Sequence, residues 1–352
     1  MPFDTSPSRR ILKSYPLRLF LLALGWLVLI SLLHFSINSD REARQVIRMG
    51  YMPVITNLAA PLLDYASLKN TRSARFKAIK FASFAEMAEA LRNNSIQAAF
   101  IIAPLSIVLR QQGEDVKVVY IGNRHESTLV ARKELHAKTL QDLVGRTIAV
   151  PMRYSGHNLC LLRLIDDAGL DGQIRVVEMN PPDMASALAS GSLDAYFVGE
   201  PFAAQTLKSG EADRIFYVKQ VWPDFICNLV LVNAKFIQKD PGAVRHLVEG
   251  AVRSGFWAQG HLQQAAEVAA RYWGQPRDLV EYALNTPPKR IVFDRYIPLQ
   301  GEMQQIADLM VRFGLVQTPK IDGLVEDRFA RNAALSGITD DVASILGLPD
   351  SD

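Results

Sequence analysis

Cysteine is almost absent from this sequence, which carries only Cys160 and Cys227 among 352 residues. Two thiols exclude a disulfide framework and any metal site built from several thiolates. The two could pair in an oxidising compartment, but each lies in an apolar run, and this placement favours buried free thiols.

Patterns of catalysis and metal binding are missing as well. The six histidines are scattered, and neither a Gly-x-Ser-x-Gly motif nor a phosphate-binding loop occurs. The acidic pairs Asp166–Asp167 and Asp340–Asp341 are interpreted as solvated faces or helix caps. We therefore predict a protein that is not an enzyme, with no catalytic residue, no metal site and no cofactor.

The net charge is small, because the chain has 39 basic and 36 acidic residues. Residues 1–35 hold four of the basic residues and one acid, so 35 of each sign remain in the rest of the chain. A neutral remainder does not favour nucleic-acid binding. A chain of 352 residues is too long to fold around one ordinary hydrophobic core, which favours two lobes.

The one long hydrophobic run extends from Leu19 to Phe35. It is short for a membrane span and long for a signal-peptide core, and it has no polar face that would suit a buried helix. Basic residues within segment 1–18 place the N-terminus in the cytoplasm and all residues after the run outside. We favour a membrane anchor over 19–35 followed by a linker over 36–45, with a cleaved signal as the alternative.

Beyond the linker, strand-like and helix-like segments alternate. Strands are predicted over 45–52, 74–82, 97–104 and 115–122, and again within 140–151, 173–180, 193–202 and 227–237, with helices between most of them. Such repetition implies right-handed crossover units on mostly parallel sheets. Residues 241–273 are predicted to be helical, and 277–345 to be helices with loops. The sequence thus indicates an α/β fold.

Four segments carry a family resemblance: MGYMPVITNLAAPLL (49–63), residues 90–127, SGHNLCLLRLIDDAGL (155–170) and MNPPDMASALASGSLDAYFVGEPFAAQ (179–205). With them the chain resembles the nitrate/sulfonate/bicarbonate-binding proteins of ABC transporters, nearest to the nitrate and bicarbonate branch. The resemblance implies a type II periplasmic-binding-protein fold with a ligand cleft between two lobes. The implied parts are lobe one (46–124 plus 228–330), lobe two (125–227) and a C-terminal tail (331–352).

Candidate ligand-binding residues follow the predicted strands, where helix N-termini present free N–H groups that attract anions. They are Thr56 and Asn57, Ala103, and Ser155, Gly156, His157 and Asn158. The alternative is that these residues only cap helices. Within the resemblance, His157 is the strongest candidate, because the nitrate-binding branch has a histidine in this loop.

Two charged residues complete the predicted site. Arg124 lies at the first crossing between lobes and could bind an oxyanion or form a hinge ion pair. Glu200, at a strand end, could accept from a donor on the ligand or from a bound cation. We favour bracing of the opposite lobe or orientation of donors, since a carboxylate repels an anion. Asn228 and Cys227 stand where the nitrate-like branch has a lysine, which weakens the case for nitrate.

The resemblance implies the extracytoplasmic solute-binding component of an ABC importer, monomeric, which captures a small anionic solute by hinge closure. Its partners would be that solute and a membrane permease, with no nucleic acid. It would lie on the periplasmic or extracytoplasmic face, anchored in the inner membrane or released after signal cleavage. The alternatives are a membrane-tethered ligand-sensing domain and a thiamine-precursor enzyme or binding protein of the same fold.

Overall fold

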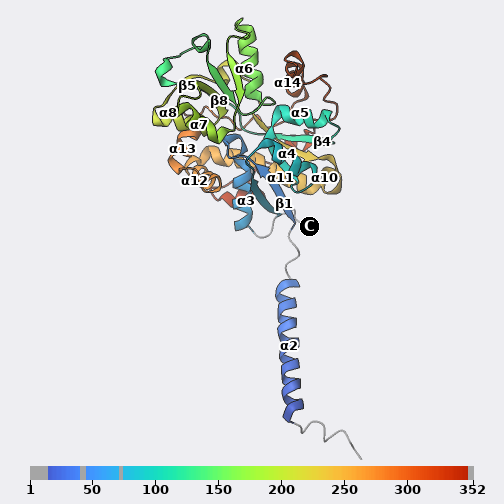
Figure 1. The fold of residues 1–352 in the computed structure, drawn as a ribbon. Helices are drawn as coiled ribbons and strands as arrows, with labels where there is room; N and C mark the ends of the chain where they lie inside the picture. The colour runs from blue at the N-terminus through green and yellow to red at the C-terminus, as the bar shows by residue number, and fades with distance from the viewer. Residues whose placement is uncertain (1–14, 40–44, 71–73, 348–352) are drawn as a thin grey trace, which may run out of the picture. The chain divides into compact units, whose positions relative to one another are not determined.

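The computed structural model describes residues 15–39, 45–70 and 74–347, so most of segment 1–18, part of the linker and the last five residues lie outside the description. The chain divides into two compact units, Met1–Gln45 and Val46–Asp352 (Figure 1). In the first unit, helix α2 covers Tyr15–Ser39. Its part Tyr15–His34, with a mean hydropathy of 2.2, is long and apolar enough to cross a membrane, although a signal sequence passes the same test.

The second unit contains two five-stranded sheets. The first has the order β2-β1-β3-β10-β4, built from Arg75–Lys80, Val46–Tyr51, Ala98–Ile102, Asn228–Asn233 and Val116–Ile121. Strands β2, β1 and β3 pair in parallel, whereas β10 runs antiparallel between β3 and β4. Helices α3 (Ala59–Lys69), α4 (Phe84–Arg92), α5 (Ala103–Gln111), α10 (Ala234–Lys239) and α11 (Pro241–Gly260) belong to this half.

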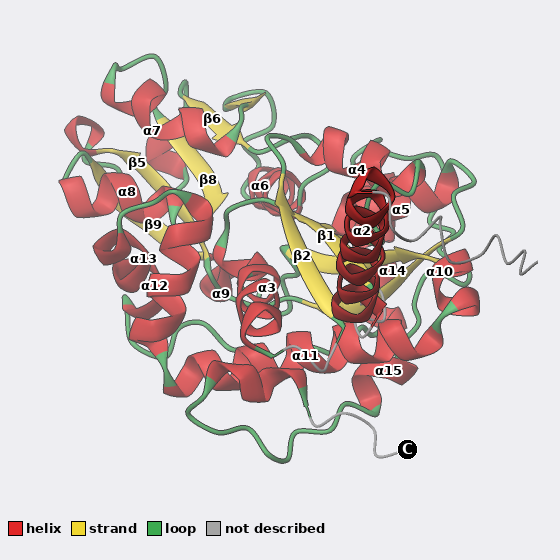
Figure 2. Cartoon of the chain, turned by 90° about the horizontal axis from the view of Figure 1, so that it is seen from below, coloured by secondary structure: helices red, strands yellow, loops and turns green. Residues whose placement is uncertain are grey.

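The second sheet repeats this plan in the order β7-β6-β8-β5-β9. Its strands are Arg175–Glu178, Thr147–Val150, Ala195–Gly199, Ser127–Arg132 and Ala212–Tyr217, and β5 is the antiparallel one. Its helices are α6 (Gly156–Asp167), α7 (Pro181–Ala189), α8 (Phe202–Ser209) and the short α9 (Val218–Val221). In each sheet four strands therefore share one direction, in keeping with the mostly parallel lobes that we predict. Figure 2 shows the two sheets as separate groups of strands.

Local sequence explains where these elements begin and end. The predicted N-cap of α4 forms, because the Ser83 hydroxyl accepts a hydrogen bond from the Glu86 N–H at 3.2 Å. Strand β3, with the sequence AAFII, is buried at every position, as expected for a strand covered on both faces. Strands β5 and β9 are absent from our sequence predictions.

The antiparallel strands begin where the chain passes between the sheets. The first crossing leaves β4 through Gly122 and enters β5 at Ser127, and the second ends at Asn228, the first residue of β10. A methyl group added to Gly122 would lie 2.6 Å from the Thr56 carbonyl oxygen, so only glycine permits this close approach. Both crossings therefore lie against the loop that follows β1.

The C-terminal elements contact both halves. They are α12 (Leu262–Trp273), α13 (Arg277–Asn285), α14 (Gln300–Arg312) and α15 (Arg328–Arg331). Helix α13 packs on α12 and also on α8, and α14 packs on α5 and also on α6. Arg312 of α14 forms an ion pair with Asp166 of α6. The short helix Val342–Leu346 packs on α3 and α11, and Ile345 within it is fully buried.

Candidate functional site

Loops from both sheets meet at a cluster of buried polar side chains. A direct link joins the halves, because the Ile55 N–H donates to the Glu200 carbonyl oxygen at 2.8 Å. We call the buried cluster the central polar network; it consists of Asn57, Glu126, Ser127, His157, Glu200, Cys227 and Asn228. Asn57 lies in the turn after β1, His157 on α6 and Glu200 directly after β8, and the other four residues lie at or beside the crossings.

Thr56 and Asn57 lie where the sequence predicts, in the 3₁₀ turn Ile55–Asn57 before α3. The Asn57 amide donates to the Met52 carbonyl oxygen at 2.9 Å, and its own oxygen accepts from the Asn228 amide at 2.8 Å. The Thr56 hydroxyl is buried without a hydrogen-bond partner among the described residues. A buried hydroxyl without a partner favours a place for a water or a ligand group.

Ser155 and Asn158 cap helix α6, which is the alternative role we considered for them. The Ser155 hydroxyl accepts from the Asn158 N–H at 3.1 Å, and the Asn158 amide donates to the Arg153 carbonyl oxygen at 2.8 Å. A methyl group added to Gly156 would lie 2.8 Å from the ring of Phe225. The absent side chain of Gly156 thus lets α6 approach the second crossing.

His157 is buried in aromatic packing, whereas we expected a donor facing an open gap. Its ring lies edge-on to Phe197 and Phe225, with centroid distances of 5.0 and 5.4 Å. Burial lowers the pKa of His157 to about 3, so the imidazole is neutral. Its Nε2 lies 2.9 Å from the Ser127 hydroxyl, and its Nδ1 is buried with no partner among the described residues.

Arg124 and Ala103 already have hydrogen-bond partners in the structure. The Arg124 guanidinium binds both carboxylate oxygens of Glu302, at 3.1 and 2.8 Å, which is the hinge ion pair we considered as its alternative role. The Ala103 N–H donates to the Cys227 carbonyl oxygen at 3.0 Å, so it is not a free donor. Neither residue offers a group to a solute in this arrangement.

Glu200 connects the two halves. Its carboxylate accepts from the Thr128 hydroxyl at 2.9 Å and from the Ala204 N–H at 2.7 Å. It also forms a buried ion pair with Arg290 at 3.3 Å, and the Arg290 guanidinium lies over the ring of Tyr217. Burial raises the pKa of Glu200, and the charge of Arg290 opposes that rise. With its carbonyl oxygen on Ile55, Glu200 is placed as a brace.

Sequence reasoning missed Glu126, the most unusual group of the network. Its carboxylate is buried and accepts from the Ser127 hydroxyl at 2.8 Å and from the Glu200 N–H at 2.7 Å. The Cys227 thiol lies beside it. Burial raises the pKa of Glu126 to about 7. The sequence signal is slight: an acid directly before the apolar stretch STLVAR.

Within the described part of the chain, the network has neither a free cation nor a metal site. The described residues contain no group of three or more His, Cys, Asp or Glu side chains placed to hold a metal ion. Its one nearby guanidinium, Arg290, is paired with Glu200. The arrangement can therefore bind a small solute through hydroxyl, amide, imidazole and backbone groups, with Glu126 as the group whose charge changes near neutral pH.

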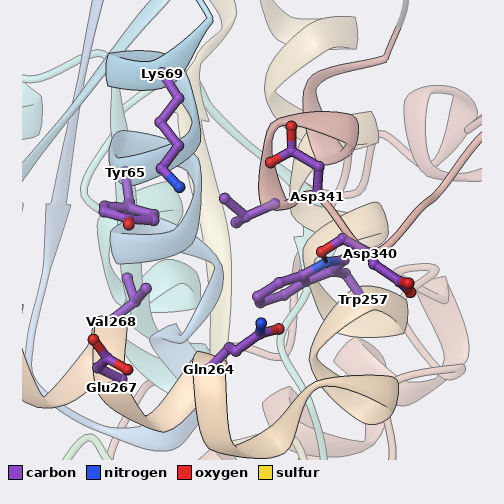
Figure 3. Close-up of a pocket in the computed structure, with 9 residues that line it drawn as sticks. Tyr65, Lys69, Trp257, Gln264, Glu267, Val268, Asp340 and Asp341 are labelled. Atoms are coloured by element: carbon purple, nitrogen blue, oxygen red, sulfur yellow. Dashed lines mark hydrogen bonds between the residues drawn. The ribbon is translucent and has the colours of Figure 1, made fainter.

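Figure 3 shows a different hollow, lined by α3, α11, α12 and residues 340–342, with a volume of about 290 Å³. Tyr65 and Lys69 face Asp341 and Trp257 across it. Its polar groups already have structural partners: the Lys69 ammonium lies 4.8 Å from the Tyr65 ring, and Asp341 accepts from the Ala343 N–H at 3.0 Å. We therefore place the candidate site at the network.

Comparisons with known proteins agree with this architecture. The chain is 28% identical over 199 residues to the "Putative aliphatic sulfonates-binding protein" of Bacillus subtilis, covering 55% of this chain and 58% of that protein. It is 24% identical over 301 residues to an Escherichia coli protein of the same name, covering 84% and 92%. The chain thus spans little more than half of the first relative and nearly all of the second.

Solved structures share the fold. The periplasmic nitrate-binding protein of Synechocystis superposes with a TM-score of 0.71 at 13% identity, covering 82% of this chain and 88% of that one. The desulfurization enzyme DSZB is also similar, with a TM-score of 0.57 at 15% identity over 82% of this chain and 99% of that one. The fold is therefore that of periplasmic solute-binding proteins, which an enzyme shares.

The family follows from the sequence match. The NMT1-like family model matches residues 40–272, well over half of the chain. The chain belongs to the NMT1-like family.

The raised pKa of Glu126 predicts a pH-dependent stability. Glu126 binds its proton more tightly in the folded state than in the unfolded state, so protonation of Glu126 stabilises the fold. This stabilisation is full below about pH 4.5 and is lost as pH rises through about 7. Relative to Glu126→Gln, the wild type should lose on the order of 3 kcal/mol of unfolding free energy between pH 4.5 and pH 8. Urea unfolding of both proteins across that range measures the difference.

The control is Glu86→Gln on the exposed face of α4, which should leave the pH dependence of the wild type unchanged. Equal pH slopes for the wild type and Glu126→Gln would show that Glu126 keeps an ordinary pKa.

Proposed function

We propose that this chain is the extracytoplasmic solute-binding component of an ABC importer, which closes two lobes on a small oxoanion. The observation that carries this is the central polar network, where loops from both sheets bring buried polar groups together. The relatives named for sulfonates and the structure named for nitrate support the same class of solute. The lobes are 46–124 plus 228–330 and 125–227, and the chain acts as a monomer that delivers its solute to a membrane permease.

Binding would use hinge closure. Contacts made only when the lobes are together shift the population towards the closed form. The Ile55–Glu200 hydrogen bond is one such contact, since its two partners come from different sheets. The Thr56 hydroxyl and the His157 Nδ1 are each buried without a partner among the described residues, and the proposed solute would supply one to each.

An anion next to Glu126 is repelled while that carboxylate is charged, so we propose that the solute binds when Glu126 is protonated. With Glu126 ionised, Ser127 donates its proton to the carboxylate, and the His157 Nε2 must donate to Ser127. The His157 Nδ1 is then only an acceptor. With Glu126 protonated, the carboxyl can donate to Ser127 and Ser127 to Nε2. The imidazole then carries its proton on Nδ1 and can donate to the anion.

A nucleophilic role for Cys227 receives no support from its surroundings. Burial, with Glu126 as a further cause, raises the pKa of the Cys227 thiol well above its usual value. A thiol that stays protonated is a poor nucleophile. The likeness to DSZB is therefore one of fold, and binding is the function that the site favours.

A thermal-shift screen of residues 40–352 tests the proposed function. The panel contains nitrate, nitrite, bicarbonate, taurine, alkanesulfonates and thiamine precursors, and stabilisation should follow RT ln(1 + [L]/Kd). For a sulfonate, which does not titrate in this range, Kd should rise towards tenfold per pH unit above pH 7. Glu126→Gln, whose amide can donate to Ser127, should bind equally well at pH 6 and pH 8, and Ser127→Ala should bind weakly at both.

Stabilisation by a thiamine precursor alone would overturn the oxoanion assignment. Deletion of the gene should abolish cellular uptake of the bound solute; unchanged uptake would instead assign the chain to ligand sensing.

We further propose that α2 is an uncleaved membrane anchor, with the folded unit outside the cytoplasmic membrane. The support is the apolar helix Tyr15–His34, with arginines before it and Asp40–Glu42 after it. Mass spectrometry of the native protein should find the peptide containing Trp26 in carbonate-washed membranes. A soluble mature protein that begins after residue 35 would identify the helix as a cleaved signal.

A further inference from the structure

A pocket formed by loops next to the central polar network differs from that network in chemistry. Its volume is about 290 Å³. From the first half it is lined by Met52, Ser83, Phe84 and Ala85, and from the second by Pro151, Met152, Glu178, Met179, Asn180 and Pro181. It thus lies between strand-end loops of both sheets, as the network does.

Two hydrogen bonds connect this pocket to residues of the candidate site. The Met52 carbonyl oxygen accepts from the Asn57 amide at 2.9 Å, and Asn57 belongs to the network. On the other side, the Met152 carbonyl oxygen accepts from the Ser155 N–H at 3.0 Å, directly before the helix that carries His157. The loop after β1 therefore carries both Met52 of the pocket and Asn57 of the network. The loop before α6 carries both Met152 of the pocket and Ser155 of the candidate site.

The pocket is built for an apolar group. Three thioether side chains, one phenyl ring and two proline rings line it, and no cation does. The carboxylate of Glu178 accepts from the Arg153 N–H at 2.8 Å, which gives that acid a structural partner. Methionine side chains are flexible and polarizable, so they adapt to tails of different shape. A second anion would find no opposite charge here.

We propose that this methionine-lined pocket receives the apolar tail of the solute whose oxoanion group binds at the central polar network. The proposal rests on the proposed function and narrows its solute class to oxoanions with an aliphatic or aromatic substituent. At about 30 Å³ per water in the liquid, the pocket has the space of roughly ten waters. That is room for a chain of several carbons, and two relatives are named for aliphatic sulfonates.

Titration calorimetry at pH 6 with methane-, propane-, pentane- and octanesulfonate tests the tail pocket. Each added methylene that enters the pocket should tighten Kd by about fourfold, and the gain should stop once the pocket is full. Met152→Ser should reduce the gain per methylene while leaving the Kd of methanesulfonate unchanged. Met152 is only partly buried, so the fold should tolerate the change, and a melting curve verifies this.

Two further variants sharpen the test. Ala85→Phe places a ring in the pocket from the exposed first turn of α4 and should weaken octanesulfonate more than tenfold, with methanesulfonate unaffected. Leu68→Ser, on an exposed apolar side chain of α3 outside the pocket, is the matched control and should change neither Kd.

The outcomes separate the two proposals. Binding of alkanesulfonates with no dependence on chain length, or an unchanged slope in Met152→Ser, would overturn the tail pocket and leave the proposed function intact. Binding of nitrate or bicarbonate but of no alkanesulfonate would do the same. Failure of every oxoanion to bind would overturn both.

Discussion

The placement of Glu200 is the constraint on which the rest of the structure depends. Its carbonyl oxygen accepts from the Ile55 N–H of the opposite sheet, and its carboxylate pairs with Arg290 from the C-terminal region. Both ionic partners are almost fully buried, so each needs the other: a buried charge that loses its partner is strongly destabilising. The two halves and the C-terminal region are thereby tied at one residue.

The contacts of Glu200 determine which charged groups the central polar network contains. The nearby Arg290 is paired with Glu200, and among the described residues the neighbouring Glu126 accepts from hydroxyl, N–H and thiol donors. A carboxylate in such surroundings shifts towards its neutral form. Ser127 connects this acid to the neutral imidazole of His157, so the proton on Glu126 decides which groups the site can offer. Burial at the junction of the halves thus shifts the pKa of both Glu126 and His157.

Much of the fold was predictable, because alternating apolar strands and amphipathic helices are local patterns. The β3 stretch AAFII and the helix cap at Ser83 are examples, and both form as expected. Strand β5 was missed because it follows the crossing directly, without a helix between it and β4. The roles of Glu126 and Arg290 were also out of reach, since each depends on partners that only the tertiary fold brings close, such as Glu200, 90 residues from Arg290.

The positions of the predicted site residues were easier to predict than their contacts. Thr56, Asn57 and Glu200 follow strands, as predicted, and lie where loops of both halves meet. The side chains of Ser155 and Asn158 satisfy the helix beside them, which is the commonest use of such residues before a helix. Arg124 pairs with Glu302, an acid 178 residues away, and no local pattern could indicate that choice. Polar residues at strand ends thus indicate a site, while partners distant in sequence decide their roles.

The brace at Glu200 is tested most directly by measuring the separation of the two halves. Spin labels at Lys235→Cys on α10 and Gln205→Cys on α8 occupy exposed positions, while the native Cys160 and Cys227 are buried. With bound solute, pulsed electron–electron double resonance should give one narrow, short distance in the wild type. In Arg290→Met, which removes the partner of Glu200, the distribution should be broad and longer. Identical narrow distributions in both proteins would contradict the account.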